Sequence, residues 1–338
     1  MRYLHVQVKT HMRLKNILLI LSAASLVVLP SCHKKDKDTE SDPSLSGTLS
    51  FSIPVFVKTG EVLTVTPKGA SNPTTGNVGY YWYTSWNSTR DTVKTEYGSG
   101  DGSWTLSAPL ATGTYSVYVT AFATDYTSLY ATKQIIVVDP SLEGSLKGAG
   151  YETSSSMVDP RDAGVYYLAT AGEKVWMRNN LYYSGSGVSY ESSSAMDPIV
   201  GRLYNWEEAI SACPDGWHLP TDEEFATMAG ASGEILSSVA GSLMADAYFN
   251  GDKLWTFWPD VKITNSTKFS AIPVGYAIDQ EGNVKYMGSG QYATFWTASD
   301  SGDTAMYRYI YVDKKDIYLG HGDKESFRAS VRCVKDDD

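Results

Sequence analysis

Residues 201–225 read GRLYNWEEAISACPDGWHLPTDEEF and carry the clearest indications of local structure in the chain. Apolar side chains recur there at helical spacing, which predicts one buried helix face. That face consists of Trp206, Ala209, Ile210 and Cys213. The turn residues Pro214–Gly216 end the helix. Thr221 stands three residues before Glu224, the spacing of a capping box, so a second helix is expected to start there.

The same stretch combines a Cys, a His and three acids, a combination that also occurs in active sites and metal sites. Asp222, Glu223 and Glu224 fall in the first turn of the second predicted helix, where the helix dipole favours negative charge. His218 has no second His or Cys at metal-ligand spacing, which favours a structural role. An acid–base or metal-binding role for these residues is the alternative.

The N-terminus has the pattern of a bacterial export signal. Residues 12–32, MRLKNILLILSAASLVVLPSC, place a basic segment before an apolar run that is short for a transmembrane helix. The ending resembles a lipobox, which implies that Cys32 is lipidated and becomes the mature N-terminus; a plain cleaved signal is the alternative. We expect a signal peptide over residues 1–31 and an outer-membrane lipoprotein, lipid-anchored and exposed at the cell surface.

A polar tether over residues 32–46 leads into a segment of short alternating stretches, residues 47–140. Seven candidate strands, one of them at residues 90–97, predict an immunoglobulin-like β-sandwich. Trp82 lies in mid-strand, and Tyr115 heads a strand like the tyrosine of a tyrosine corner. The segment resembles a PKD-type module and is expected to act as a spacer; a pilin-like or partner-docking module is the alternative.

Residues 141–150 contain Gly and Ser with little hydrophobic pattern and are predicted to be a linker. Beyond them, residues 151–338 form the second predicted domain. If lipidation uses Cys32, Cys213 and Cys333 remain as an exported pair. In an oxidising compartment such a pair favours a disulfide. A nucleophilic cysteine with His218 as its base is the competing interpretation.

Composition narrows the function classes. The formal net charge is −10 and no basic patch stands out, which argues against nucleic-acid binding. The chain has 24 Tyr and 9 Trp, side chains that combine an apolar body with a hydrogen-bonding tip. This abundance is typical either of a β-rich protein with Tyr on its strands or of a face that binds carbohydrate or a partner.

Four further segments occur on either side of the opening stretch. One precedes it, EKVWMRNNLYY (173–183), and three follow it, FSAIPVGY (269–276), FWTAS (295–299) and ASVRCVKD (329–336). Together they resemble the Fibrobacter succinogenes major paralogous domain, FISUMP. The resemblance implies a C-type lectin-like α+β fold and a disulfide between Cys213 and Cys333. It also places Trp217, Pro220, Trp296 and Arg332 at motif positions. The chain lacks the triplets of calcium-dependent lectins, so neither a metal nor another cofactor is expected.

The ligand is expected to bind where aromatic residues stand beside acids, because sugar rings stack on aromatic faces while polar groups take their hydroxyls. The candidate residues are Trp255, Trp258, Asp260, Tyr286, Tyr292 and Asp300. The sequence thus predicts a β-rich, two-domain, non-catalytic surface protein that binds a glycan or a protein ligand. The alternative is a structural subunit of a surface assembly, such as a pilus-like tip or a scaffold.

Overall fold

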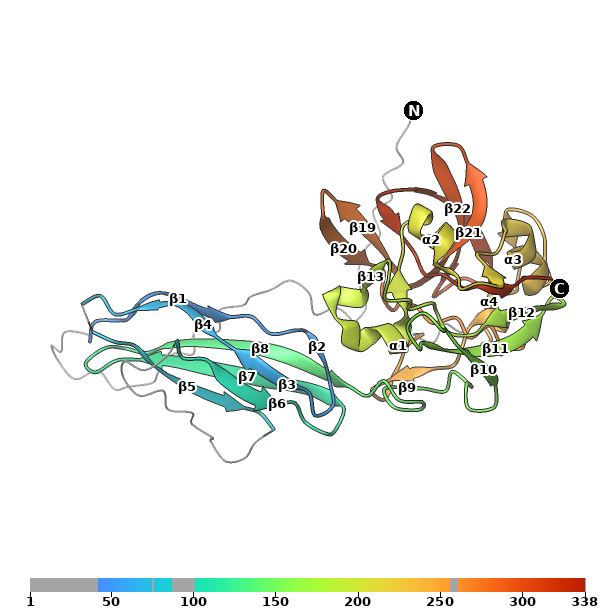
Figure 1. Ribbon diagram of the computed structural model, residues 1–338. Coiled ribbons are helices and arrows are strands. Elements are labelled where there is room, and N and C mark those ends of the chain that lie inside the picture. The colour runs from blue at the N-terminus through green and yellow to red at the C-terminus, as the bar shows by residue number, and fades with distance from the viewer. Residues whose placement is uncertain (1–41, 75, 87–100, 256–260, 338) are drawn as a thin grey trace. The chain divides into compact units, whose positions relative to one another are not determined.

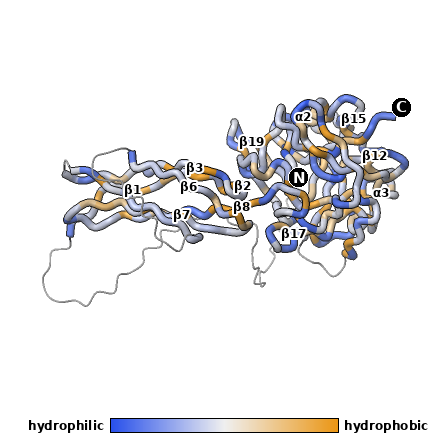
Figure 2. Tube along the Cα trace, turned by 60° about the horizontal axis from the view of Figure 1, so that its bottom comes forward, coloured by the Kyte–Doolittle hydropathy of each residue, from blue (hydrophilic) through white to orange (hydrophobic). Residues whose placement is uncertain are grey.

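The computed structural model describes residues 42–74, 76–86, 101–255 and 261–337. Strands dominate and the helices are short (Figure 1). Hydrophobic stretches run mainly along the strands, whereas many turns are hydrophilic (Figure 2). Among the described residues, no helix has the length and the apolar character needed to cross a membrane.

Residues 42–140, the N-terminal β region, form strands joined by turns. Its strands are β1 (Ser46–Phe51), β2 (Phe56–Lys58), β3 (Val62–Val65), β4 (Pro67–Ser71), β5 (Gly79–Thr84), β6 (Trp104–Ser107), β7 (Gly113–Phe122) and β8 (Leu129–Val138). They pair as a four-stranded sheet, β2-β8-β7-β5, and two ribbons, β1-β4 and β3-β6. The strand expected at residues 90–97 lies outside the described residues.

Two expectations for this region are confirmed. Trp82 on β5 is fully buried, and its indole N–H donates to the carbonyl of Gly102 at 2.8 Å. The Tyr115 hydroxyl donates to the carbonyl of Ala111 at 3.1 Å, as in a tyrosine corner. Phe51 packs edge-on against Trp82, with ring centroids 5.2 Å apart. The core of the region therefore forms around Trp82.

The C-terminal region, residues 141–337, is a mixture of short helices and antiparallel sheets. Its helices are α1 (Asp197–Val200), α2 (Trp206–Ala212), α3 (Asp222–Ala229) and α4 (Ala240–Leu243), with 3-10 turns η1 (Tyr190–Ser192) and η2 (Ser194–Met196). Its first strands are β9 (Leu146–Lys147), β10 (Ser155–Val158), β11 (Val165–Ala171), β12 (Lys174–Met177), β13 (Val188–Ser189), β14 (Arg202–Leu203), β15 (Trp217–His218), β16 (Ile235–Leu236), β17 (Tyr248–Phe249) and β18 (Asp252–Lys253). The last strands are β19 (Tyr276–Gln280), β20 (Asn283–Met287), β21 (Tyr292–Ser301), β22 (Thr304–Tyr311), β23 (Ile317–Asp323), β24 (Phe327–Arg328) and β25 (Val334–Lys335).

Part of the expected linker belongs to a sheet. Within residues 141–150, strand β9 pairs with β17 through Leu146 and Phe249. Leu146 is buried, which gives this short strand an apolar anchor.

The helices of the opening stretch begin at capping boxes. The Thr221 side chain accepts from the Glu224 N–H, and the Glu224 carboxylate accepts from the Thr221 N–H, as predicted. Asn205 and Glu208 cap α2 in the same way. The prediction of a buried Ile210 is wrong, because this side chain is 44% exposed. The buried face of α2 contains Ala209 and Ala212, and Ile210 lies about 100° around the helix from Ala209, outside that face.

Two sheets organise the C-terminal region. The sheet β10-β11-β12-β25-β15 places the last strand between β12 and β15, where Val334 pairs with Trp176 on one side and His218 on the other. The sheet β16-β23-β22-β21 turns Phe295, Ile310 and Ile317 into the main hydrophobic core. Because neighbouring side chains on a strand point to opposite faces, the intervening residues lie on the other side of this sheet.

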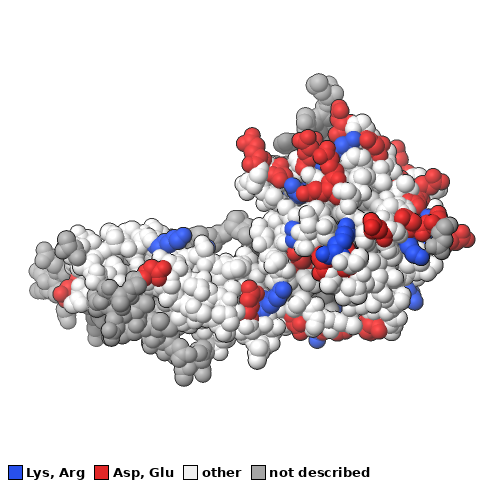
Figure 3. All heavy atoms as spheres, in the orientation of Figure 1, with Lys and Arg blue, Asp and Glu red and all other residues white. Residues whose placement is uncertain are grey.

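The surface of the C-terminal region is acidic. Acidic side chains gather near β19, α2 and β22 in the view of Figure 3. Burial contributes to this imbalance, because four arginines are buried against two aspartates. The buried arginines are Arg178, Arg308, Arg328 and Arg332, and the buried aspartates are Asp159 and Asp197.

Candidate ligand-binding face

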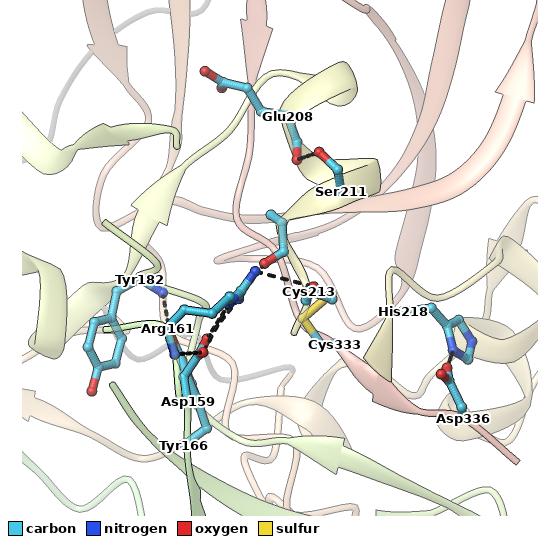
Figure 4. The surroundings of a disulfide bond; sticks show 11 residues. Asp159, Arg161, Tyr166, Tyr182, Glu208, Ser211, Cys213, His218, Cys333 and Asp336 are labelled. Atoms are coloured by element: carbon cyan, nitrogen blue, oxygen red, sulfur yellow. Dashed lines mark hydrogen bonds and ion pairs between the residues drawn. A yellow bond between two sulfur atoms is a disulfide. The ribbon is translucent and has the colours of Figure 1, made fainter. Parts of the chain in front are cut away.

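The predicted disulfide between Cys213 and Cys333 is confirmed. It joins the end of α2 to the residue before β25, across 120 positions, with the two Cα atoms 5.8 Å apart (Figure 4). Beside it, the Arg161 guanidinium donates to the carbonyl of Ala212 at 2.8 Å and is held by Asp159. Because both sulfurs are bonded to each other, neither is available as a nucleophile, and the competing interpretation with His218 as a base is wrong.

His218 lies between two carboxylates. Its Nδ1 is 2.5 Å from Asp336 Oδ1, and its Nε2 is 3.2 Å from both Glu224 oxygens (Figure 4 shows the Asp336 contact). Partial burial raises the pKa of Glu224, but hydrogen bonds from Thr221 and His218 outweigh it and lower the pKa below its usual value. These contacts fasten the segment after β25 to α3, which supports the structural interpretation of His218.

Asp222 has a second task besides its place in the first turn of α3. Its two carboxylate oxygens accept from Nε and Nη2 of Arg308, each at 2.6 Å. Arg308 lies on β22 and is only 1% exposed, so this bidentate pair ties the helix to the sheet. Asp222, Glu224 and His218 thus hold elements together.

The predicted ligand residues that the structure describes do not form one site. The structure corrects the prediction that Trp255 is a ligand-binding residue. Its side chain is 1% exposed, belongs to the main core and donates its indole N–H to the carbonyl of Ala271 at 3.1 Å. Its large apolar ring gains more from burial than from stacking on a ligand at the surface. Trp258 and Asp260 lie outside the described residues.

Tyr286 and Asp300 are engaged by other groups. The Tyr286 hydroxyl donates to the carbonyl of Ser189 at 2.7 Å. Asp300 is paired with Lys324 at 2.8 Å, and hydrogen bonding from that ammonium lowers the pKa of the carboxyl. Tyr292 lies in a larger group of tyrosines.

Tyr292 belongs to a set of six tyrosines on the side of the β16-β23-β22-β21 sheet that faces away from the main core, and on the adjoining strand β19. We call this set the tyrosine face; its members are Tyr276, Tyr292, Tyr307, Tyr309, Tyr311 and Tyr318, all half-buried. Register brings them together: Tyr292 pairs with Tyr311 across β21 and β22, and Tyr309 pairs with Tyr318 across β22 and β23.

The rings of the tyrosine face pack on one another, and Tyr276 and Tyr307 also stack on Phe327. Ring centroids are 4.6 Å apart for Tyr292 and Tyr311, 5.4 Å for Tyr309 and Tyr318, and 6.0 Å for Tyr276 and Tyr292. Gly320 stands opposite Tyr307, where an added Cβ would lie 2.3 Å from the Tyr307 ring. A glycine at this position therefore leaves the space that the Tyr307 ring occupies.

The hydroxyls of the tyrosine face are the part of it that is open to a ligand. Within the described ranges, none of the six hydroxyls has a hydrogen-bond partner, and none is a buried atom left unsatisfied. Elsewhere tyrosine hydroxyls bond to the chain, as Tyr166 and Tyr182 do. Burial raises the pKa of Tyr292, Tyr307 and Tyr309, so these hydroxyls stay protonated donors at neutral pH.

One feature of the sequence indicates part of the tyrosine face. Residues 306–312 read MYRYIYV, in which Tyr307, Tyr309 and Tyr311 alternate with period two and so share one side of a strand. The remaining members come from other strands, and nothing in their local sequence specifies the register.

The other motif positions carry structural tasks. Arg332 is buried; its guanidinium donates to the Asn180 side chain at 2.6 Å and to the carbonyls of Phe269 and Ser270. Trp296 is fully buried and donates its indole N–H to the carbonyl of Tyr204 at 2.8 Å. In the part of the chain that the structure describes, no three His, Cys, Asp or Glu side chains are grouped to hold a metal ion.

The C-terminal region thus combines short helices and antiparallel sheets, closed by a disulfide, with a tyrosine-rich sheet face. Residues 170–335 match the family model described as the Fibrobacter succinogenes major domain, which supports the assignment of this region to the FISUMP family. No curated protein gives a significant match to the chain. Among solved structures, the chain is similar to the Yersinia pseudotuberculosis adhesin InvE at 9% identity and a TM-score of 0.24, over 86% of this chain and 70% of that one.

Proposed function

We propose that the protein is a non-catalytic binding module at the bacterial surface, held in the outer membrane by a lipid on Cys32. The tyrosine face is its ligand-binding surface, and the ligand is a glycan or a protein. The N-terminal β region serves as the spacer. Disulfide bonding of Cys213 and Cys333 supports this view, because exported proteins are the ones that keep such bonds.

The observation that carries the proposal is the free state of the tyrosine hydroxyls within the described residues. Five tyrosines on one sheet face and Tyr276 on the adjoining strand β19 pack ring against ring, and in the described part of the chain none of their hydroxyls has a hydrogen-bond partner. Tyrosine is favoured at binding surfaces for this reason: it supplies a large, rigid contact area at a low cost in conformational entropy. A face that served only to cover the core would not need six hydroxyls without a hydrogen-bond partner.

The test uses cells that display the full-length chain, applied to immobilised glycans and to immobilised extracellular proteins. Wild type is compared with the double variant Tyr309→Ala/Tyr318→Ala and with Tyr130→Ala, an exposed tyrosine on β8. We expect adhesion to one of the two ligand classes, lost in the double variant and kept in the control. Adhesion that survives the double variant, or no adhesion to either class, contradicts the proposal.

A further inference from the structure

The packing of the tyrosine face restricts which ligand it fits. We propose that it binds a protein partner whose contacting surface is neutral to basic. This inference rests on the proposed function, of which it names the ligand class.

The first argument is that neighbouring rings contact one another, so part of their aromatic surface is not free for a ligand. Tyr309 and Tyr318 are stacked, with planes 24° apart and centroids 5.4 Å apart. Tyr292 has Tyr276 perpendicular to it at 6.0 Å and Tyr311 tilted against it at 4.6 Å. Sugar rings are held by stacking on an uncovered aromatic face. Rings that are turned toward each other offer a ligand mainly their edges and their hydroxyls.

Edges and hydroxyls suit a protein surface. A tyrosine edge contacts apolar side chains, and its hydroxyl donates to or accepts from backbone and side-chain groups. Tyrosine is enriched at the centres of protein interfaces and in antibody combining sites for this combination. The face also spans β19, β21, β22 and β23, so its contacts are spread over a width that suits a macromolecule.

The second argument is charge. The six side chains of the face are uncharged at neutral pH, and the nearby Asp313 acts electrostatically on Tyr292. The chain carries a net charge of −10, and acidic side chains crowd the visible surface near β19 and β22 (Figure 3). Like charges in an interface disfavour binding, so an acidic partner is selected against and a basic rim on the partner is favoured.

The experiment selects ligands without assuming a partner. The mature chain is immobilised through its N-terminus, and a phage-displayed library of random peptides is panned on it, with Tyr309→Ala/Tyr318→Ala used for counter-selection. The dissociation constants of the selected peptides are then measured on wild type, on the double variant, on Tyr309→Phe and on the control Tyr130→Ala. Far- and near-ultraviolet circular dichroism establishes that each variant is folded.

We expect enriched peptides with a net positive charge that bind the double variant at least about ten-fold more weakly and the control equally well. Tyr309→Phe, which keeps the ring, should weaken binding by a smaller factor. Higher ionic strength should also weaken binding, because exposed charges are screened. Peptides that bind the double variant as tightly as wild type, or that are acidic, overturn the inference.

A glycan array on the same variants separates this inference from the proposed function. A glycan whose binding depends on Tyr309 and Tyr318, without any enriched peptide, overturns the protein ligand and leaves the binding module in place. If neither peptides nor glycans depend on these two tyrosines, both the inference and the proposed function fail.

Discussion

Tyr309 on β22 and Tyr318 on β23 stand directly opposite each other, with stacked rings and hydroxyls that have no hydrogen-bond partner in the described part of the chain. Cross-strand aromatic pairs of this kind stabilise a sheet by a few tenths to about 1 kcal/mol. That gain depends on the rings, so the hydroxyls remain available for binding.

Removal of a face hydroxyl should leave the fold unaffected. We expect Tyr309→Phe to change the free energy of unfolding by less than about 0.5 kcal/mol. The matched variant Tyr166→Phe should cost about 1–2 kcal/mol, because the buried Tyr166 hydroxyl accepts from the Tyr182 N–H at 3.1 Å. Urea unfolding measures both. Equal losses in the two variants would mean that the Tyr309 hydroxyl has a structural partner.

Loss of the disulfide should destabilise the domain strongly. Cys213 and Cys333 enclose 120 residues, which in the chain-entropy model corresponds to about 5 kcal/mol at room temperature. We expect Cys213→Ser/Cys333→Ser to lose several kcal/mol of stability, measured by urea unfolding without reductant. Dithiothreitol should lower the stability of wild type and leave the double variant unchanged; a wild type insensitive to reductant contradicts this.

Asp222 should matter far more than its helix neighbour. Asp222→Asn leaves the buried Arg308 guanidinium without its carboxylate, and we expect a loss of about 3 kcal/mol. Glu223, the next acid in the same helix turn, is exposed, so Glu223→Gln should change stability by less than about 0.5 kcal/mol. Thermal and urea unfolding of the two variants provide the comparison, and similar losses in both would rule out a special role for the Arg308 pair.

Trp255→Ala should destabilise the protein by about 3–5 kcal/mol, because it leaves a cavity in the main core and removes one of the two hydrogen bonds to the carbonyl of Ala271. The loss of stability is the diagnostic result, measured as the shift of the urea midpoint. An unchanged midpoint would mean that Trp255 is not a core residue, and Trp255 would again be a candidate ligand-binding residue.

Acid should weaken the contacts of Glu224. Its pKa is lowered in the fold below the usual 4.5, so the stability that it contributes is present above that pH and is lost as the pH falls through the folded pKa. Wild type should therefore lose more stability than Glu224→Gln when the pH is taken from neutral to about 3. Parallel pH profiles for the two proteins would show that Glu224 is not coupled to folding.

Several features of the fold could be predicted because they depend on residues a few positions apart. The capping box of Thr221 and Glu224 and the tyrosine corner at Tyr115 are spacings of three and four residues. The Cys213–Cys333 pairing could be predicted for another reason, the small number of cysteines in a chain that is expected to be exported. The same reasoning misplaced Ile210, because periodicity indicates a helix face but not how wide its buried part is, and only Ala209 and Ala212 of α2 are buried.

The candidate site could not be predicted in the same way. In the sequence, Trp255 and Tyr292 are both aromatic residues near polar ones. In the structure, Trp255 is fully buried, whereas Tyr292 is only half-buried. Which side of a sheet meets the core is decided by contacts between distant segments. A Trp beside acids therefore predicts a sugar site no better than it predicts a core residue.

The sequence by itself determined the local signals of this protein: its export pattern, its helix caps, its cysteine pair and the alternating tyrosines of residues 306–312. Only the tertiary structure decided that Tyr276, Tyr292 and Tyr318 join those alternating tyrosines in one face. The physical reason is register. A shift of one residue between two strands moves every side chain to the opposite face, and the register is set by the packing of Phe295, Ile310 and Ile317 into the core.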